Sequence, residues 1–108
     1  MKTDQLIRVR FIDAMLSQYG QFTRRMAMDV FGISEITASR DIAVYRVFDP
    51  QMHYCNRTKV FLADTDFKEC PELWTCSATV VQFLKGIETV YDVRVGVLPV
   101  PTFGVHKA

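Results

Sequence analysis

The sequence contains no long hydrophobic run and no apolar segment at its N-terminus. Of its 108 residues, 49% are hydrophobic and 23% are charged, which is ordinary for a globular protein. No apolar run approaches the roughly 20 residues that cross a bilayer, and the opening segment MKTDQLIRVR lacks the core of a signal peptide. These absences predict a cytoplasmic protein without a membrane partner, and the length favours one domain or a small domain with an extension.

Metal-ligand spacings and catalytic motifs are also missing. Cys55, Cys70 and Cys76 are odd in number and form no CxxC pair, and including His53 and His106 produces no zinc-site spacing. We therefore expect no metal, no cofactor, and cysteines that are buried hydrophobic side chains or surface thiols. There is also no glycine-rich phosphate loop and no nucleophile placed beside a histidine, so we expect no enzymatic activity and no catalytic residues.

The net charge is only +1, but the charges are unevenly distributed. Residues 1–60 carry nine Lys or Arg against six Asp or Glu, a balance of +3, whereas residues 61–108 carry four against six, a balance of −2. Such a division is typical of a DNA-facing half joined to an assembly half, although a difference of this size also arises by chance.

The strongest motif lies in residues 22–47, FTRRMAMDVFGISEITASRDIAVYRV. Two stretches with helical periodicity are separated by a short turn, in which Gly32 supplies a positive φ angle. Thr23 and Ser34 are placed to cap the two helices. A helix pair with a short glycine turn indicates a helix-turn-helix, whose second helix enters the major groove of DNA. The same pair also occurs in domains that bind no nucleic acid.

The second helix of this pair has two distinct faces. Ala38, Ile42 and Tyr45 form one stripe, which predicts packing on the preceding helix. Near the start of the helix, the side chains expected to face or flank the major groove are Ile36, Thr37, Ser39 and Arg40. An isoleucine suits a thymine methyl group, an arginine suits guanine, and the hydroxyls suit a base or a phosphate.

The flanking sequence predicts the rest of a winged helix. Residues 3–19 have helical periodicity, which leaves Asp13 mostly on the outside. After a break at Pro50, residues 52–55 and 59–63 are expected to form two strands of a hairpin. We expect this hairpin either to be a wing that reaches phosphates or the minor groove, or merely to close the core. The basic residues near its tip are Arg57 and Lys59.

The C-terminal part has a weaker pattern. A connector over residues 63–74 precedes a helix expected over residues 77–88 and a strand with alternating valines over residues 93–97. One helix and one strand cannot make a core alone, so they must pack on the winged helix or on a second copy of the chain. We favour a homodimer, with these dimerisation residues: Val80, Leu84, Ile87, Val93, Val95 and Val97.

Several short segments together carry a family resemblance. They are RVRFID at residues 8–13, GQFTR at 20–24, FGIS at 31–34 and SEITASRD at 34–41, followed by Tyr45, Pro50, Tyr54, Lys59, Phe61 and Phe67. In this order they resemble the N-terminal winged helix of WYL-domain transcriptional regulators, most closely the subgroup that controls phage-defence operons. SEITASRD is also similar to the recognition helix of DeoR-type repressors.

The resemblance implies a mainly α fold with a small β wing. A winged helix-turn-helix DNA-binding domain would span residues 1–66, and a connector, helix and strand forming a dimerisation extension would span residues 67–108. Residues 83–101 resemble the segment that leads into the WYL domain, and the chain stops about where that domain would begin. We therefore expect no small-molecule effector; the chain is either a short natural regulator or a fragment.

The resemblance also implies roles for charged residues. Arg57 and Lys59 belong to the wing, and Arg25 is well placed for a phosphate. Arg24 begins the second helix and Asp41 lies on the flank of the third, so we expect an ion pair between them across the turn.

These observations favour a sequence-specific transcriptional regulator whose partner is double-stranded DNA. We expect an autoregulatory repressor that binds a pseudo-palindromic operator as a homodimer. The alternative is a protein-interaction module that uses a winged-helix scaffold without sequence-specific DNA binding. Binding to sheared genomic DNA at low salt would distinguish them.

Overall fold

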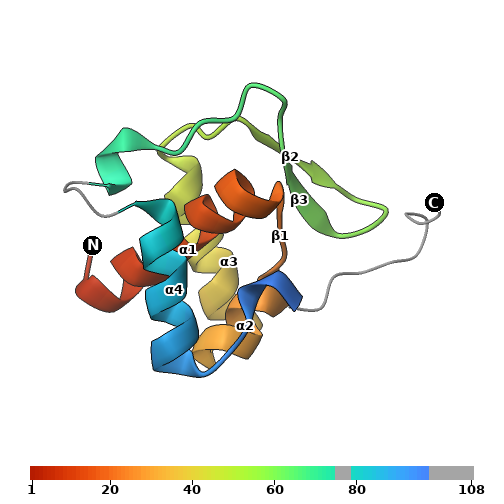
Figure 1. The fold of residues 1–108 in the computed structure, drawn as a ribbon. Helices are drawn as coiled ribbons and strands as arrows, with labels where there is room; N and C mark the ends of the chain where they lie inside the picture. Colours follow the sequence, from red (N-terminus) through yellow and green to blue (C-terminus); the bar gives the residue numbers. More distant parts are fainter. Residues whose placement is uncertain (75–78, 98–108) are drawn as a thin grey trace.

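Three helices form the first half of the chain in the computed structural model, which describes residues 1–74 and 79–97. They are α1 (Thr3–Tyr19), α2 (Arg24–Phe31) and α3 (Glu35–Arg46), and they pack around one core (Figure 1). The Thr23 hydroxyl accepts a hydrogen bond from the Met26 amide, and the Ser34 hydroxyl accepts one from the Thr37 amide. Gly32 ends α2 with φ 66°. The predicted caps and turn are therefore confirmed.

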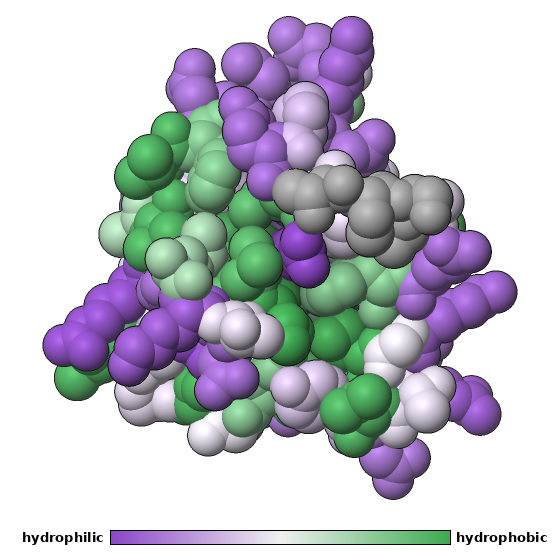
Figure 2. All heavy atoms as spheres, turned by 90° about the vertical axis from the view of Figure 1, so that its left-hand side faces the viewer, coloured by the Kyte–Doolittle hydropathy of each residue, from purple (hydrophilic) through white to green (hydrophobic). Residues whose placement is uncertain are grey.

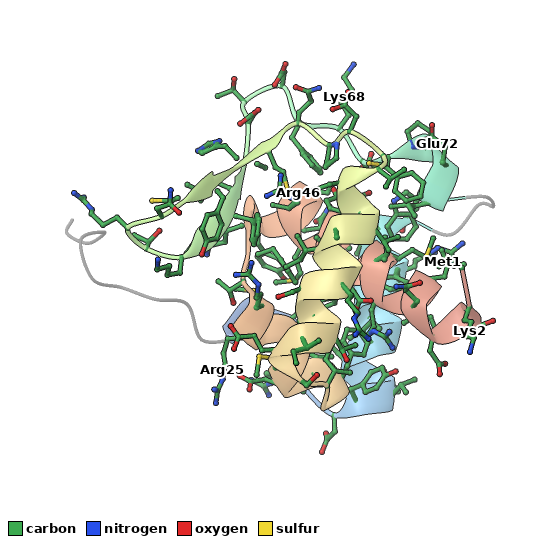
Figure 3. All side chains as sticks on the ribbon, turned by 180° about the vertical axis from the view of Figure 1, so that it is seen from behind. Met1, Lys2, Arg25, Arg46, Lys68 and Glu72 are labelled. Atoms are coloured by element: carbon green, nitrogen blue, oxygen red, sulfur yellow. The ribbon has the colours of Figure 1, made fainter. Side chains whose placement is uncertain are left out.

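The inner face of α3 is the one expected from its spacing. Ala38, Ile42 and Tyr45 are buried in the core. Their stripe faces α1 and α2, so the opposite face of α3 is left toward solvent. Figure 3 shows this arrangement, with α3 crossing the front of the molecule and the hairpin beside its C-terminal end.

A small antiparallel sheet closes one side of the helical core. Its strands are β1 (Gln21–Phe22), β2 (Met52–Cys55) and β3 (Val60–Ala63), in the order β1-β3-β2. The hairpin β2–β3 was predicted, but its second strand begins one residue later because Lys59 lies in the turn with φ 61°. The sequence did not indicate β1, which pairs Phe22 with Phe61.

The connector leads through a short 3₁₀ helix, η1 (Pro71–Leu73), to α4 (Val80–Tyr91). Thr79 caps α4 by a capping box with Gln82. The helix therefore begins and ends about three residues later than expected. None of the helices in the described residues has the length and apolarity of a membrane span.

The strand expected over residues 93–97 is wrong. Asp92 ends α4 in the left-handed conformation, and Val95–Val97 form a second 3₁₀ helix, η2. The Val93 amide donates to the Glu88 carbonyl and the Val95 amide donates to the Glu88 carboxylate, at 3.2 and 3.0 Å. The segment thus folds back on α4, so the alternating valines reflect a turn whose Val95 is buried rather than the pleat of a strand.

The side chains expected to line a dimer interface lie largely in the chain's own core, and the homodimer stays a prediction. Helix α4 packs on α1, and the chain's own core contains Val80, Leu84, Ile87 and Val95, with Val93 packed against it. The side chain of Val97 lies outside the described residues. These side chains are covered by the winged helix, which was the other arrangement open from the sequence.

The core therefore continues past the expected boundary at residue 66, and the division into two domains stays a prediction. The outer side of α4 still exposes Val81 and Val90. Figure 2 views the side of the molecule that carries α4 and shows apolar surface in the middle of this face, with hydrophilic side chains around it.

Candidate nucleic-acid interface

The solvent-facing side of α3 presents an apolar side chain and a cation one helical turn apart. Ile36 is 66% exposed, which core packing does not explain. Arg40, one turn further along, is exposed and makes no ion pair with any residue in the part of the chain that the structure describes. Both side chains are therefore accessible to a ligand that lies along the N-terminal half of α3.

The two hydroxyl residues on this helix are less open. Thr37 is half-buried, and its hydroxyl accepts a hydrogen bond of 3.1 Å from the Ser34 hydroxyl. The Ser39 hydroxyl accepts a hydrogen bond of 2.9 Å from Nε of Arg24. Each retains its own hydroxyl hydrogen for donation, so both residues flank the exposed face and contact with DNA remains a prediction.

Arg24 and Asp41 do not form the expected ion pair. Asp41 is paired with Arg8 on α1, with 2.6 Å between its Oδ2 and Nε of Arg8. Its Oδ1 also accepts a hydrogen bond of 3.2 Å from Gln5. The physical reason is that Asp41 lies on the side of α3 that is buried against α1, whereas Arg24 contacts Ser39 of α3 and the rings of Tyr54 and Phe61 on the sheet.

The wing projects away from the helices, with its tip at the turn between β2 and β3 (Figure 1). Arg57 and Lys59 are exposed around this turn, whereas Thr58 between them is buried. Hydrogen bonds from Thr58 lower the pKa of the Cys55 thiol. The buried threonine thus anchors the turn, and the two cations on either side of it remain accessible.

Arg25 lies in the first turn of α2 and points outward from the molecule (Figure 3). Its guanidinium forms an exposed ion pair with Asp29, one turn further along α2, at 3.0 Å. An exposed pair of this kind contributes little to stability, and it leaves the arginine able to exchange its carboxylate for a phosphate.

A buried carboxylate fixes α3 to the rest of the fold, and the sequence placed it wrongly on the outside. Asp13 is 0% exposed and accepts hydrogen bonds from the Tyr45 hydroxyl at 2.5 Å, the Cys70 amide at 3.0 Å and the Trp74 indole at 2.7 Å. Its partners come from α3 and from the connector, up to 61 residues away in the chain. No local spacing could have identified them.

This cluster also shifts the pKa values of its members. Burial, with the Asp13 carboxylate beside it, raises the pKa of the Tyr45 hydroxyl above its ordinary value. The same two causes raise the pKa of the Cys70 thiol to about 12. Both groups therefore stay protonated at neutral pH, and the Tyr45 hydroxyl donates to the carboxylate. The cluster is a structural one, because each of its buried side-chain polar atoms has a partner.

The remaining metal-ligand candidates do not come together in the described residues. His53 lies on the wing, where its Nδ1 is 2.7 Å from Asp64. Cys70 belongs to the Asp13 cluster, and Cys55 is half-buried at the turn of the wing. Cys76 and His106 lie outside the described residues.

Comparison with known families agrees with this architecture. A family model described as the BrxR transcriptional regulator winged helix-turn-helix domain matches residues 4–88. No curated protein matches the chain significantly. The match extends from the start of α1 through the helix-turn-helix and the wing into α4, so it confirms the resemblance to the winged helix of a phage-defence regulator. The chain belongs to the family of BrxR transcriptional regulator winged helix-turn-helix domains, and so to the DNA-binding regulators of transcription.

Proposed function

We propose that the chain is a sequence-specific repressor that controls its own gene within a phage-defence operon. The observation that carries the proposal is the exposed face of α3, on which the accessible Ile36 lies beside an Arg40 without an ion pair in the described residues. A helix of this kind reads base edges from the major groove through residues near its N-terminus. The apolar side chain suits a thymine methyl group, and the arginine suits the O6 and N7 atoms of guanine.

The remaining polar residues would position the domain on the duplex. Thr37 and Ser39 flank the exposed face of α3 and can donate a hydroxyl hydrogen to a base or a phosphate. Arg25, Arg57 and Lys59 are exposed cations on α2 and on the wing, where they would neutralise phosphates. Affinity would thus come mostly from these cations, and discrimination between sequences from α3.

We further propose that two copies bind a pseudo-palindromic operator. The proposal rests on the helix-turn-helix itself, since such domains commonly bind half-sites one helical turn apart as dimers. Most of the side chains first expected at the dimer interface are packed in the monomer core, so we look for the contact on other surfaces. Val81 and Val90 on the outer side of α4 are exposed apolar residues that support a contact of this kind.

A fluorescence-anisotropy titration tests the proposed function. The probes are tiled fragments of the DNA upstream of the gene, with random DNA as competitor, at low and at physiological salt. Selective binding to one fragment that survives the competitor is the expected result, and a protected site of two half-sites would support the dimer. Uniform binding would reduce the role to non-specific DNA binding, and no binding would favour the protein-interaction module.

Two substitutions separate base reading from phosphate binding. Arg40→Ala is expected to cost about 1–3 kcal/mol at one base pair and to relax specificity there, because it removes a contact to a base edge. Lys59→Ala should weaken binding to all sequences about equally and lower the salt dependence by about one phosphate. Lys85→Ala on α4 is the charge-matched control. Equal losses on specific and random DNA for Arg40→Ala would exclude base reading by this residue.

A further inference from the structure

Arg24 lies where the recognition helix, α2 and the wing meet. Its Nε donates to the Ser39 hydroxyl of α3 at 2.9 Å. Its guanidinium carbon lies 5.7 Å from the centre of the Tyr54 ring on β2 and 5.6 Å from the centre of the Phe61 ring on β3. One side chain from the start of α2 thus contacts both the helix that faces DNA and the two strands of the wing.

These contacts leave the outer end of the guanidinium free. Among the described residues, no acceptor lies within hydrogen-bonding distance of its two terminal nitrogens. The described residues also include no buried side-chain nitrogen without a partner, so these two nitrogens are open to solvent. They carry four N–H groups whose direction is fixed, because the Nε hydrogen bond and the two rings hold the guanidinium plane.

The free end of Arg24 opens into a surface hollow between α2, the first turn of α3 and the wing. The charged side chains that line this hollow are Arg24, Arg25, Lys59 and Glu35. Three cations against one carboxylate favour an anion. Arg25 already has Asp29 as a partner, whereas Lys59 has no ion pair within residues 1–74 and 79–97.

We propose that Arg24 binds one backbone phosphate of DNA with its terminal nitrogens and positions the wing against the recognition helix. A planar guanidinium matches two phosphate oxygens at once, and a guanidinium that is already held loses little conformational freedom on binding. Lys59 lies on the wing side of the same hollow, where it is placed to bind a neighbouring phosphate of the same duplex. The phosphate would therefore lie between α2 and the wing. Its position relative to α3 would be set by the hydrogen bond between Arg24 and Ser39.

The proposal rests on DNA binding but not on a particular operator, so a short random-sequence duplex is a sufficient probe. The dissociation constant of the full chain is measured by anisotropy over a range of salt concentrations, which gives the slope of log Kd against log salt. Arg24→Gln is expected to weaken binding about tenfold. It should also reduce the slope by about 0.9, the value for one phosphate contact.

Arg10→Gln is the matched control. Arg10 makes the same two kinds of contact as Arg24, since its Nε donates to the Leu73 carbonyl at 2.6 Å and its guanidinium lies 5.9 Å from the Trp74 ring. These contacts are with the connector rather than with α3 or the wing. The control is therefore expected to leave the salt slope unchanged, although it loses the same charge.

Arg24→Lys distinguishes the effect of the positive charge from the effect of the bidentate guanidinium geometry. It also provides a second test if Arg24→Gln does not fold. The lysine retains the phosphate's counter-charge but not the bidentate contact, so the slope should match that of the wild type while Kd rises several-fold. Wild-type Kd and slope in Arg24→Lys would overturn the bidentate contact. An unchanged slope in a folded Arg24→Gln variant would show that Arg24 is only structural, whereas a wild-type chain that binds no duplex would refute DNA binding itself.

Discussion

Removal of the Tyr45 hydroxyl tests whether the buried Asp13 cluster fixes the recognition helix to the fold. The hydroxyl donates to the Asp13 carboxylate at 2.5 Å, and both residues are 0% exposed. A hydrogen bond to a charged group contributes about 1.5–3 kcal/mol to stability. In Tyr45→Phe the ring stays in place, and the carboxylate keeps the donors of Cys70 and Trp74. We therefore expect a loss in the free energy of unfolding of about 2 kcal/mol, in the lower part of that range.

Urea unfolding provides the assay, because the chain has one tryptophan and Trp74 donates to the same carboxylate. With a urea m-value of about 1–3 kcal/mol/M, a loss of about 2 kcal/mol lowers the midpoint by about 1 M. Tyr91→Phe is the control, since within the described part of the chain the Tyr91 hydroxyl makes no hydrogen bond. A change in Tyr45→Phe below about 0.5 kcal/mol, or equal to that of the control, would refute the assigned role of the cluster.

Two further predictions concern stability. The ordinary pKa values of Tyr45 and Cys70 are 10.0 and 9.0, and folding raises both, so the unfolded chain releases these protons first. Titration of these two groups should therefore leave the free energy of unfolding constant below about pH 9 and lower it as the pH rises toward 12. The fall should be smaller in Tyr45→Phe. A rise in the free energy of unfolding over this range would contradict the raised pKa values. Gly32→Ala should destabilise the chain by about 1 kcal/mol, because φ is 66° there. The cost comes from the backbone conformation alone, since no neighbouring atom lies within 4 Å of the added methyl. Gly86→Ala, in the middle of α4 with equally open space, should stabilise it by about 0.5–1 kcal/mol, and thermal unfolding that showed the same sign for both would refute the backbone argument.

The parts of the fold that the sequence predicted correctly depend on neighbours a few residues apart. The caps at Thr23 and Ser34 and the glycine turn at Gly32 are of this kind. So is the hairpin, whose strands are joined by a turn of a few residues. Such signals need no knowledge of the rest of the chain, which explains why the helix-turn-helix was predicted in detail.

The features that were missed depend on distant partners. Strand β1 has only two residues, and it exists because it pairs with β3, 39 residues further along at the Phe22–Phe61 pair. Asp13 lies on the polar side of its helix in the periodic pattern, but α3 and the connector cover it with three donors. The partner of Asp41 is 33 residues away on α1. Sequence periodicity does not report which element covers a residue.

The same limit explains the error at the C-terminal end. The stripe on α4 correctly indicated that Val80, Leu84 and Ile87 are buried. It did not indicate whether a second copy or the same chain buries them, since an apolar stripe satisfies either arrangement. Because α4 packs on α1, the same chain buries these three residues. A dimer contact is therefore to be sought on other surfaces.

The central claim is that DNA lies along the exposed face of α3 and against the wing. A titration of the ¹⁵N-labelled chain with the upstream fragment, followed through its backbone amide resonances, tests this claim most directly. We predict that the largest changes fall at residues 34–40, at Arg24 and Arg25, and at residues 56–59. Binding with changes concentrated on α4 or η1, and none on α3, would contradict the account.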